Sequence, residues 1–295
     1  MRYLKRDGVL GRLLRPGLVI IALASIGTQA IHAEQNQKAE DLYHRTDYQA
    51  SLKLLDSNTD DADVQNLIGR NYYMLAEFKR AVEHFQNASS QQPSNSNYVL
   101  WLGRAWGRRA ETSNPLLAAA YASKARQCFE KAVQLDGKNQ EALSDLLDYY
   151  LEAPAIMGGG FDKAQRVAEQ IAATNAAEGY SARARLAEQK RQYATAEQQL
   201  HRALDSAPGE VGRILDLAKF LAKQGRTQES DALFMRASAL APDAPKVWYA
   251  RADTLIRTKR NFPEAKLLLH RYLQAPITPD DPSKGDAQTL LRAVN

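Results

Sequence analysis

A helical unit recurs along most of the chain, and this repetition limits the possible folds more than any other feature. Pro208 is followed 34 residues later by Pro242, and Ile214 is followed 34 residues later by Trp248. The clearest copy places small and large apolar residues at helical spacing: Ile68, Gly69, Tyr72, Phe78, Ala81, Phe85 and Ala88. The chain is also rich in Ala, Leu, Gln, Glu, Lys and Arg, without runs of alternating β-branched residues. We therefore expect an all-α fold built from repeated hairpins.

The repeated pattern resembles the tetratricopeptide repeat (TPR), a 34-residue helical hairpin. This resemblance implies an α-α superhelix, or solenoid, of about seven hairpins over residues 34–275, followed by a linker and a capping helix over 276–295. The copies lie near residues 36–58, 62–95, 96–138, 140–174, 177–210, 211–244 and 245–275. The first copy is weak, as a terminal repeat is allowed to be.

Two copies carry insertions between their helices. The third is about ten residues longer around 111–118 and the fourth about five longer around 154–160, and we expect loops at both places. The run Gly158 to Gly160 before Lys163 raises the question of a phosphate loop. It lacks both the Gly-Lys-Ser/Thr ending and a preceding strand, so we interpret it as a turn that needs positive backbone angles.

The first 33 residues are typical of a secretory signal peptide. A basic stretch precedes the short uncharged run 17–27, and Ala33 offers a small residue for cleavage. We expect an exported protein, most readily periplasmic, otherwise secreted or held in the inner membrane by an uncleaved segment. This segment carries +4 of the net charge of +5, so the remainder gives no electrostatic reason to bind nucleic acid. The single cysteine, Cys128, excludes an intramolecular disulfide, and we expect its thiol to be buried.

The TPR resemblance also implies where partners bind. In the family, the first helices of the hairpins line a concave groove, and certain repeat positions face it. The candidate groove residues are the matching positions Asn66, Arg70, Tyr73, Arg104, Arg108, Glu141, Asp148, Arg185, Lys219, Lys223, Tyr249 and Arg257, together with Asp145, which lies beside those of the fourth copy. They predict a groove with a basic band, an acidic band on the fourth copy, and a second basic band.

These observations favour a non-enzymatic scaffold or adaptor that binds protein or peptide partners in the bacterial cell envelope. Assembly, secretion and polysaccharide export are the processes considered, and no cofactor is expected. The alternative is a helical-array hydrolase or metal-binding protein that uses the carboxylates Glu141, Asp145 and Asp148. The residues do not indicate the oligomeric state.

Overall fold

The computed structural model describes residues 32–294, and every regular element in this range is helical. The predicted signal peptide therefore lies almost entirely outside the described residues. Residues 32–44 form a helix that pairs with α2 (Tyr48–Leu54). The elements that follow are α3 (Ala62–Met74), α4 (Phe78–Gln91), α5 (Ser96–Glu111), α6 (Pro115–Leu135), α7 (Gln140–Glu152), the short 3₁₀ turn η1 (Ala155–Met157), α8 (Phe161–Thr174), α9 (Ala176–Gln189), α10 (Tyr193–Ser206), α11 (Val211–Lys223), α12 (Thr227–Leu240), α13 (Pro245–Arg257), α14 (Phe262–Gln274) and α15 (Lys284–Ala293).

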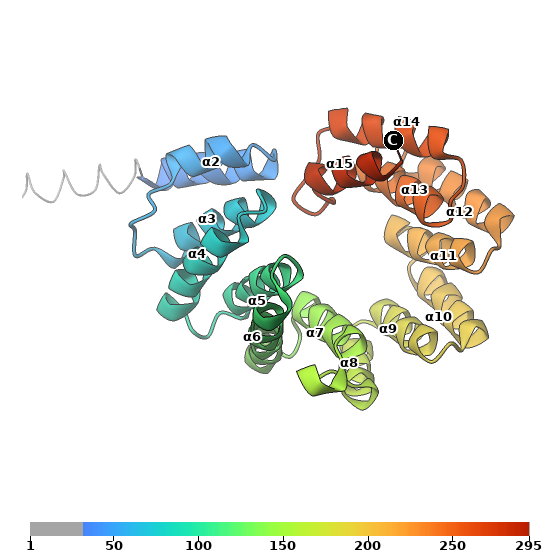
Figure 1. Cartoon of the computed structure of the whole chain (residues 1–295), viewed down its shortest axis with the longest axis horizontal. Helices are drawn as coiled ribbons and strands as arrows, with labels where there is room; N and C mark the ends of the chain where they lie inside the picture. The colour runs from blue at the N-terminus through green and yellow to red at the C-terminus, as the bar shows by residue number, and fades with distance from the viewer. Residues whose placement is uncertain (1–31, 295) are drawn as a thin grey trace, which may run out of the picture.

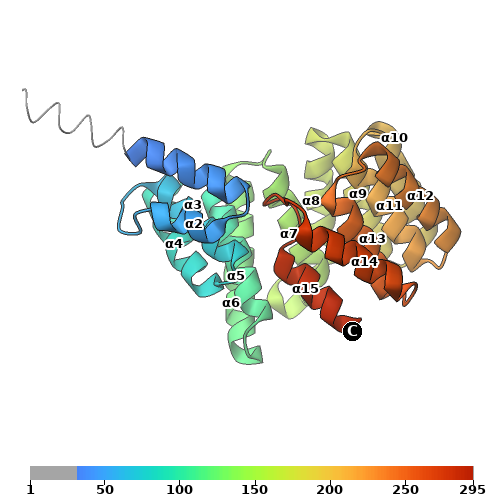
Figure 2. The same cartoon turned by 90° about the horizontal axis from the view of Figure 1, so that it is seen from above.

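Consecutive helices pair into hairpins, and the hairpins stack side by side into an open ring (Figure 1). The odd-numbered helices from α3 to α13 line the inner side of the ring, and their even-numbered partners form the outer side. The predicted all-α superhelix is thus confirmed. α2 and α15 lie on opposite sides of the gap in the ring, and the turned view also places the segment before α15 close to the N-terminal hairpin (Figure 2).

Close approach of the two helices in a hairpin depends on small residues at fixed positions. A Cβ atom added to Gly69 would lie 2.7 Å from the ring of Phe85, and one added to Gly103 would lie 2.7 Å from the ring of Phe129. Ala81 is completely buried in the same layer. The glycines and alanines therefore set the helix separation, and the phenylalanine rings fill the space that this separation leaves.

Polar caps fix where several inner helices begin. The side chains of Asp61, Asn95, Asn139 and Asn175 accept backbone N–H bonds at the starts of α3, α5, α7 and α9. Ser283 does the same for α15. Each cap satisfies N–H groups that have no partner within the helix and is worth about 1 kcal/mol. The start of the helix, and hence the rotational phase of its apolar face, follows from these short-range contacts.

The prediction that the insertion in the third copy forms a loop is wrong. α5 has 16 residues and α6 has 21, compared with 13 and 14 for α3 and α4, so the insertion lengthens both helices. Asn114 caps α6 and Pro115 occupies its first turn. The alanine-rich start of α6 has high helix propensity, so it continues the helix beyond the stack, where Leu116 is 89% exposed.

The insertion in the fourth copy forms a structured turn, as predicted. Gly158 has φ +89° and Gly160 has φ +155°, angles that other residues rarely adopt. The Gly160 N–H donates to the carbonyl of Tyr150 at 2.9 Å, and Lys163 Nζ donates to the carbonyl of Gly158 at 2.9 Å. Lys163 therefore holds the turn itself. A Cβ atom on Gly159 would lie 1.8 Å from the carbonyl oxygen of Ala153, so this position also requires glycine.

The C-terminal helix covers the last hairpin, which confirms the predicted cap. Ala287 of α15 is fully buried against Leu269 and Tyr272 of α14, and Ile277 of the linker joins the same cluster. The Tyr272 hydroxyl donates to the carbonyl of Pro282, which ties the linker to α14. The apolar face that an additional repeat would have covered is thereby removed from water.

Candidate functional site

Three adjoining hollows follow the inner face of the ring. The first lies between α5 and α7 above α6, and has a volume of about 400 Å³. The second lies between α7, α9 and α11 with about 470 Å³, and the third lies between α11 and α13 with about 600 Å³. Asp148 lines both the first and the second hollow, and Lys219 and Lys223 line both the second and the third. The hollows are therefore parts of one groove.

The structure brings most of the predicted groove residues to these hollows, but not all of them. Those that line a hollow are Tyr73, Arg104, Arg108, Asp145, Asp148, Arg185, Lys219, Lys223 and Arg257. Asn66, Arg70, Glu141 and Tyr249 do not line any of the three. Tyr249 instead packs against Tyr272, 5.3 Å between ring centroids, within the cluster that α15 covers. Burial, followed by the charges of Asp286 and Asp253, raises the pKa of Tyr249 to about 12.

Arg104 joins α5 to α7 on the floor of the first hollow. Its Nε atom lies 2.6 Å from Asp145 Oδ2, and its Nη1 atom lies 2.8 Å from Glu141 Oε2. The side chains of Arg104 and Asp145 are only 21% and 24% exposed. Burial alone would lower the pKa of Arg104, but hydrogen bonds and charge from Asp145 and Glu141 outweigh it and raise the pKa. The guanidinium is therefore fully charged and held in place.

Similar pairs join the next helices. Arg185 of α9 forms an ion pair with Asp148 of α7 and donates to Ser144 at 3.3 Å. Lys223 of α11 lies 2.9 Å from Glu188 of α9. The bands predicted from the sequence are therefore not separate, because cations of one helix reach across to carboxylates of the next. Each pair spans two copies of the repeat and stabilises the angle between them.

Trp101 links the first copies at the N-terminal end of the groove. The guanidinium of Arg70 lies 5.3 Å from the Trp101 ring centroid, and that of Arg104 lies 4.9 Å from it. Arg70 also lies 4.3 Å from the ring centroid of Tyr43 and donates to its hydroxyl at 3.2 Å. Arg70 is thus held by cation–π contacts to the first hairpin and to α5. Arg70 therefore holds neighbouring repeats together and does not line any of the three hollows.

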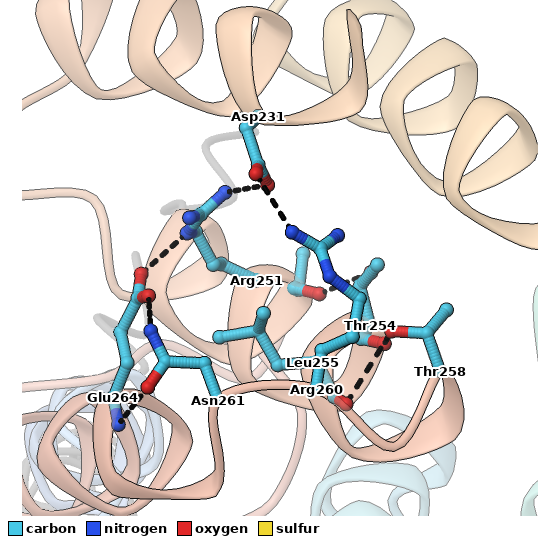
Figure 3. Close-up of polar contacts among 9 residues, drawn as sticks. Asp231, Arg251, Thr254, Leu255, Thr258, Arg260, Asn261 and Glu264 are labelled. Atoms are coloured by element: carbon cyan, nitrogen blue, oxygen red, sulfur yellow. Dashed lines mark hydrogen bonds and ion pairs between the residues drawn. The ribbon is translucent and has the colours of Figure 1, made fainter. Parts of the chain in front are cut away.

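A charged network supports the wall of the third hollow (Figure 3). Asp231 of α12 accepts from Arg251 of α13 at 2.9 Å and from Arg260 at 2.8 Å. Arg251 also pairs with Glu264 of α14 at 2.6 Å, and Glu264 is held by Asn261. Burial would raise the pKa of Asp231, but hydrogen bonds from Arg260 and Arg251 outweigh this effect and lower it. Three helices are therefore tied together directly behind the groove.

Sequence reasoning missed several residues of the hollows. Glu111 lines the first hollow from the extended end of α5, and Arg260 lines the third from the turn after α13. Both lie outside the periodic positions that face the groove in a regular repeat, so periodicity could not identify them. Glu152, which also lines the first hollow, does occupy such a position. The sequence does indicate this residue, because Glu141, Asp145, Asp148 and Glu152 follow one another at helical spacing on one stripe.

Cys128 is half-buried rather than fully buried, so the expectation for its thiol is met only in part. Burial raises the pKa of this thiol to about 11. Among residues 32–294, no cluster of three or more His, Cys, Asp or Glu residues is arranged to hold a metal ion. Within the same range, no helix has the length and apolar character needed to span a membrane.

Comparisons with known proteins agree with this architecture. Residues 187–254 match the family model described as tetratricopeptide repeat. This part of the chain therefore consists of tetratricopeptide repeats, and the described residues as a whole form a solenoid like that of TPR proteins. A search of curated protein sequences found no match. The residues that match the family model span α10 to α12 with parts of α9 and α13, the region where the sequence shows the 34-residue spacing most clearly.

Solved structures of several proteins share the fold at low sequence identity. A TPR protein from Parabacteroides merdae has a TM-score of 0.57 at 13% identity, covering 89% of this chain and 98% of that one. A thermophilic TPR protein from Thermus thermophilus has a TM-score of 0.53 at 20% identity, covering 64% and 98%. A chain of the APC/C hetero-tetramer Cut9–Hcn1 has a TM-score of 0.50 at 15% identity, covering 87% and 48%. These likenesses concern the fold alone.

Proposed function

We propose that this TPR protein is a non-enzymatic scaffold that binds extended protein or peptide segments in its inner groove. The observation that carries the proposal is the continuity of the three hollows, which share Asp148, Lys219 and Lys223. An extended segment can place side chains in successive hollows while its backbone follows the groove. The TPR fold supports this class of function, since a solvent-facing concave surface made of stacked hairpins is how repeat proteins present a long binding site.

The carboxylates of α7 favour the scaffold over the hydrolase alternative. Asp145 is bonded to Arg104 and Asp148 to Arg185, so both are engaged in ion pairs between helices. A general base or a metal ligand needs a carboxylate whose oxygen is directed at a substrate or an ion. Their role in this structure is to join neighbouring repeats.

We also propose that the protein acts in the bacterial cell envelope. The support is the composition of residues 1–33, with basic residues, a short apolar run and Ala33 before Glu34. Mass spectrometry of protein isolated from cells should find a mature N-terminus at or near Glu34 in the periplasmic fraction. A chain that begins at Met1 and stays in the cytoplasm would refute this location. An intact chain in the membrane fraction would indicate a membrane-tethered protein and refute the soluble periplasmic form.

Selection from a random peptide display library tests the scaffold proposal. We expect enriched peptides to bind the purified protein in fluorescence anisotropy. The double variant Gly107→Trp with Lys223→Trp should weaken binding by about tenfold or more, because both indoles enter the groove. Gly107 is suited to this change, since a Cβ atom there has no neighbour within 4 Å. Circular dichroism checks that the variant is folded.

The matched control places a tryptophan on the outer side of the ring. Leu267 of α14 is 70% exposed, so Leu267→Trp adds the same side chain away from the groove. Binding should be unchanged in this variant. The absence of any enriched peptide, or equal loss in the groove variant and the outer variant, would refute the proposal.

A further inference from the structure

The charge of the groove changes sign along its length. Two cations and four carboxylates line the first hollow, an excess of two negative charges: Arg104, Arg108, Glu111, Asp145, Asp148 and Glu152. Three cations and three carboxylates line the second. Four cations and one carboxylate line the third, an excess of three positive charges: Lys219, Lys223, Arg257, Arg260 and Asp253. The groove thus has a negative end in the third and fourth copies and a positive end in the sixth and seventh.

Ion pairs within the protein engage three of the four carboxylates that line the negative end. Arg104 is bonded to Asp145, Arg108 lies 3.2 Å from Glu111, and Asp148 is paired with Arg185 of α9. Glu152 forms no ion pair among residues 32–294. Burial, followed by the charges of Asp148 and Glu111, raises the pKa of Glu152, and Arg185 opposes this only in part. A positive charge from outside the chain would therefore be stabilised here.

The negative hollow also offers apolar surface to such a cation. The rings of Tyr73, Phe129 and Tyr149 line it together with Met157. The aliphatic stem of an arginine or a lysine can lie against these side chains while its charged group approaches Glu152. The hollow therefore matches a long basic side chain better than it matches a small inorganic cation.

The positive end keeps charges that internal pairing does not remove. Lys219 forms no ion pair within the described residues, and Arg257, although bonded to Asp253, has a side chain that is 77% exposed. Lys223 is 66% exposed beside Glu188. Arg260 is held by Asp231 from behind the wall. Acidic side chains that enter this hollow would meet several cations that remain in contact with water.

We infer that the groove binds an extended peptide segment that carries basic side chains in the first hollow and acidic side chains in the third. This inference rests on the proposed peptide-binding function. Three helix-to-helix steps of about 8–10 Å separate the two hollows. At about 3.3 Å per residue, the basic and acidic groups of the segment lie about eight residues apart. A nucleic acid or another polyanion does not fit, because the first hollow would repel it.

Synthetic peptides of one composition but different charge order test the inference. Two segregated peptides each carry a basic pair and an acidic pair separated by about eight uncharged residues. The basic pair is at the N-terminal end of one peptide and at the C-terminal end of the other. A third peptide has the same residues with the charges interleaved. In fluorescence anisotropy, we expect one segregated peptide to bind about tenfold tighter than the interleaved one, and to weaken as salt is added.

Reversal of the groove charges provides a readout that loss of folding cannot imitate. Lys219→Glu with Lys223→Glu should weaken the preferred peptide, as should Glu111→Lys with Glu152→Lys. The protein that carries all of these substitutions should prefer the segregated peptide of opposite direction. Equal binding of segregated and interleaved peptides, or an unchanged preference after full reversal, would overturn the inference. If display-selected peptides still bind in the groove, the scaffold proposal stands; if no peptide of either kind binds, the scaffold proposal fails.

Discussion

Substitution of two glycines in the same helix tests whether helix separation depends on a missing side chain. Gly103 and Gly107 are one turn apart in α5. A Cβ atom on Gly103 would lie 2.7 Å from Phe129 Cε1 and 3.0 Å from Cys128 Cβ, whereas one on Gly107 has no neighbour within 4 Å. The two positions therefore share a helix and a substitution, and differ in packing.

The expected effects have opposite signs. Alanine is favoured over glycine inside a helix by about 1 kcal/mol, so Gly107→Ala should stabilise the protein by about that amount. Gly103→Ala gains the same helix propensity but forces a methyl group into a packed layer, which costs about 1–3 kcal/mol. Phe129 is only 8% exposed, so its ring has little room to move away. The net change for Gly103→Ala is about 1 kcal/mol of destabilisation, and the two variants should differ by about 2 kcal/mol.

Urea unfolding followed by far-UV circular dichroism measures this difference, with the unfolding midpoint and slope compared for each variant. In thermal unfolding, the same difference should separate the two melting temperatures by about 2–4 °C for each kcal/mol. Equal stabilisation by both alanines would refute the packing argument. A second check is a double-mutant cycle of Gly103→Ala and Phe129→Leu. Because the smaller leucine relieves the clash with the added methyl group, the double variant should be more stable than the sum of the two single effects by about 1 kcal/mol or more.

Two further predictions concern ionisable groups. Asp231 has a lowered pKa, so its stabilising effect is present above about pH 4 and is lost as the pH falls through the pKa of the folded state. Asp231→Asn should therefore lower the free energy of urea unfolding at neutral pH, and its difference from wild type should shrink in acid. The control Asp243→Asn, at a side chain that is 91% exposed, should change this free energy little. A pH-independent difference for Asp231→Asn would contradict this assignment. The pKa of Cys128 is raised to about 11, so a maleimide should label the folded protein about a hundredfold more slowly than the urea-unfolded chain near pH 8, and equal rates would show that the thiol is not in its buried environment.

Local patterns in the sequence were sufficient to predict the hairpins and the superhelix. Gly69 with Phe85 and Gly103 with Phe129 combine a small and a large residue at a separation that a helix–turn–helix brings together, so each copy identifies its own packing. The glycines of the fourth copy likewise indicate a turn, because positive φ angles are a local requirement. The insertion in the third copy shows the limit of this reasoning, since alanine-rich residues can form a loop or extend a helix. The packing around α5 and α6 determines which of the two conformations forms.

Repeat periodicity predicts most of the charged residues that face the groove, but the packing of the hairpins establishes which of them remain available to a partner. Arg104 reaches Asp145, 41 residues away, and Arg185 reaches Asp148, 37 residues away. Such pairs depend on the angle and offset between successive hairpins, and these arise from the packing of whole faces rather than from any local signal. A periodic pattern places a charge on a helix face without identifying its partner on the next helix. The change of sign along the groove, from Glu152 to Lys219, is therefore a property of the assembled ring.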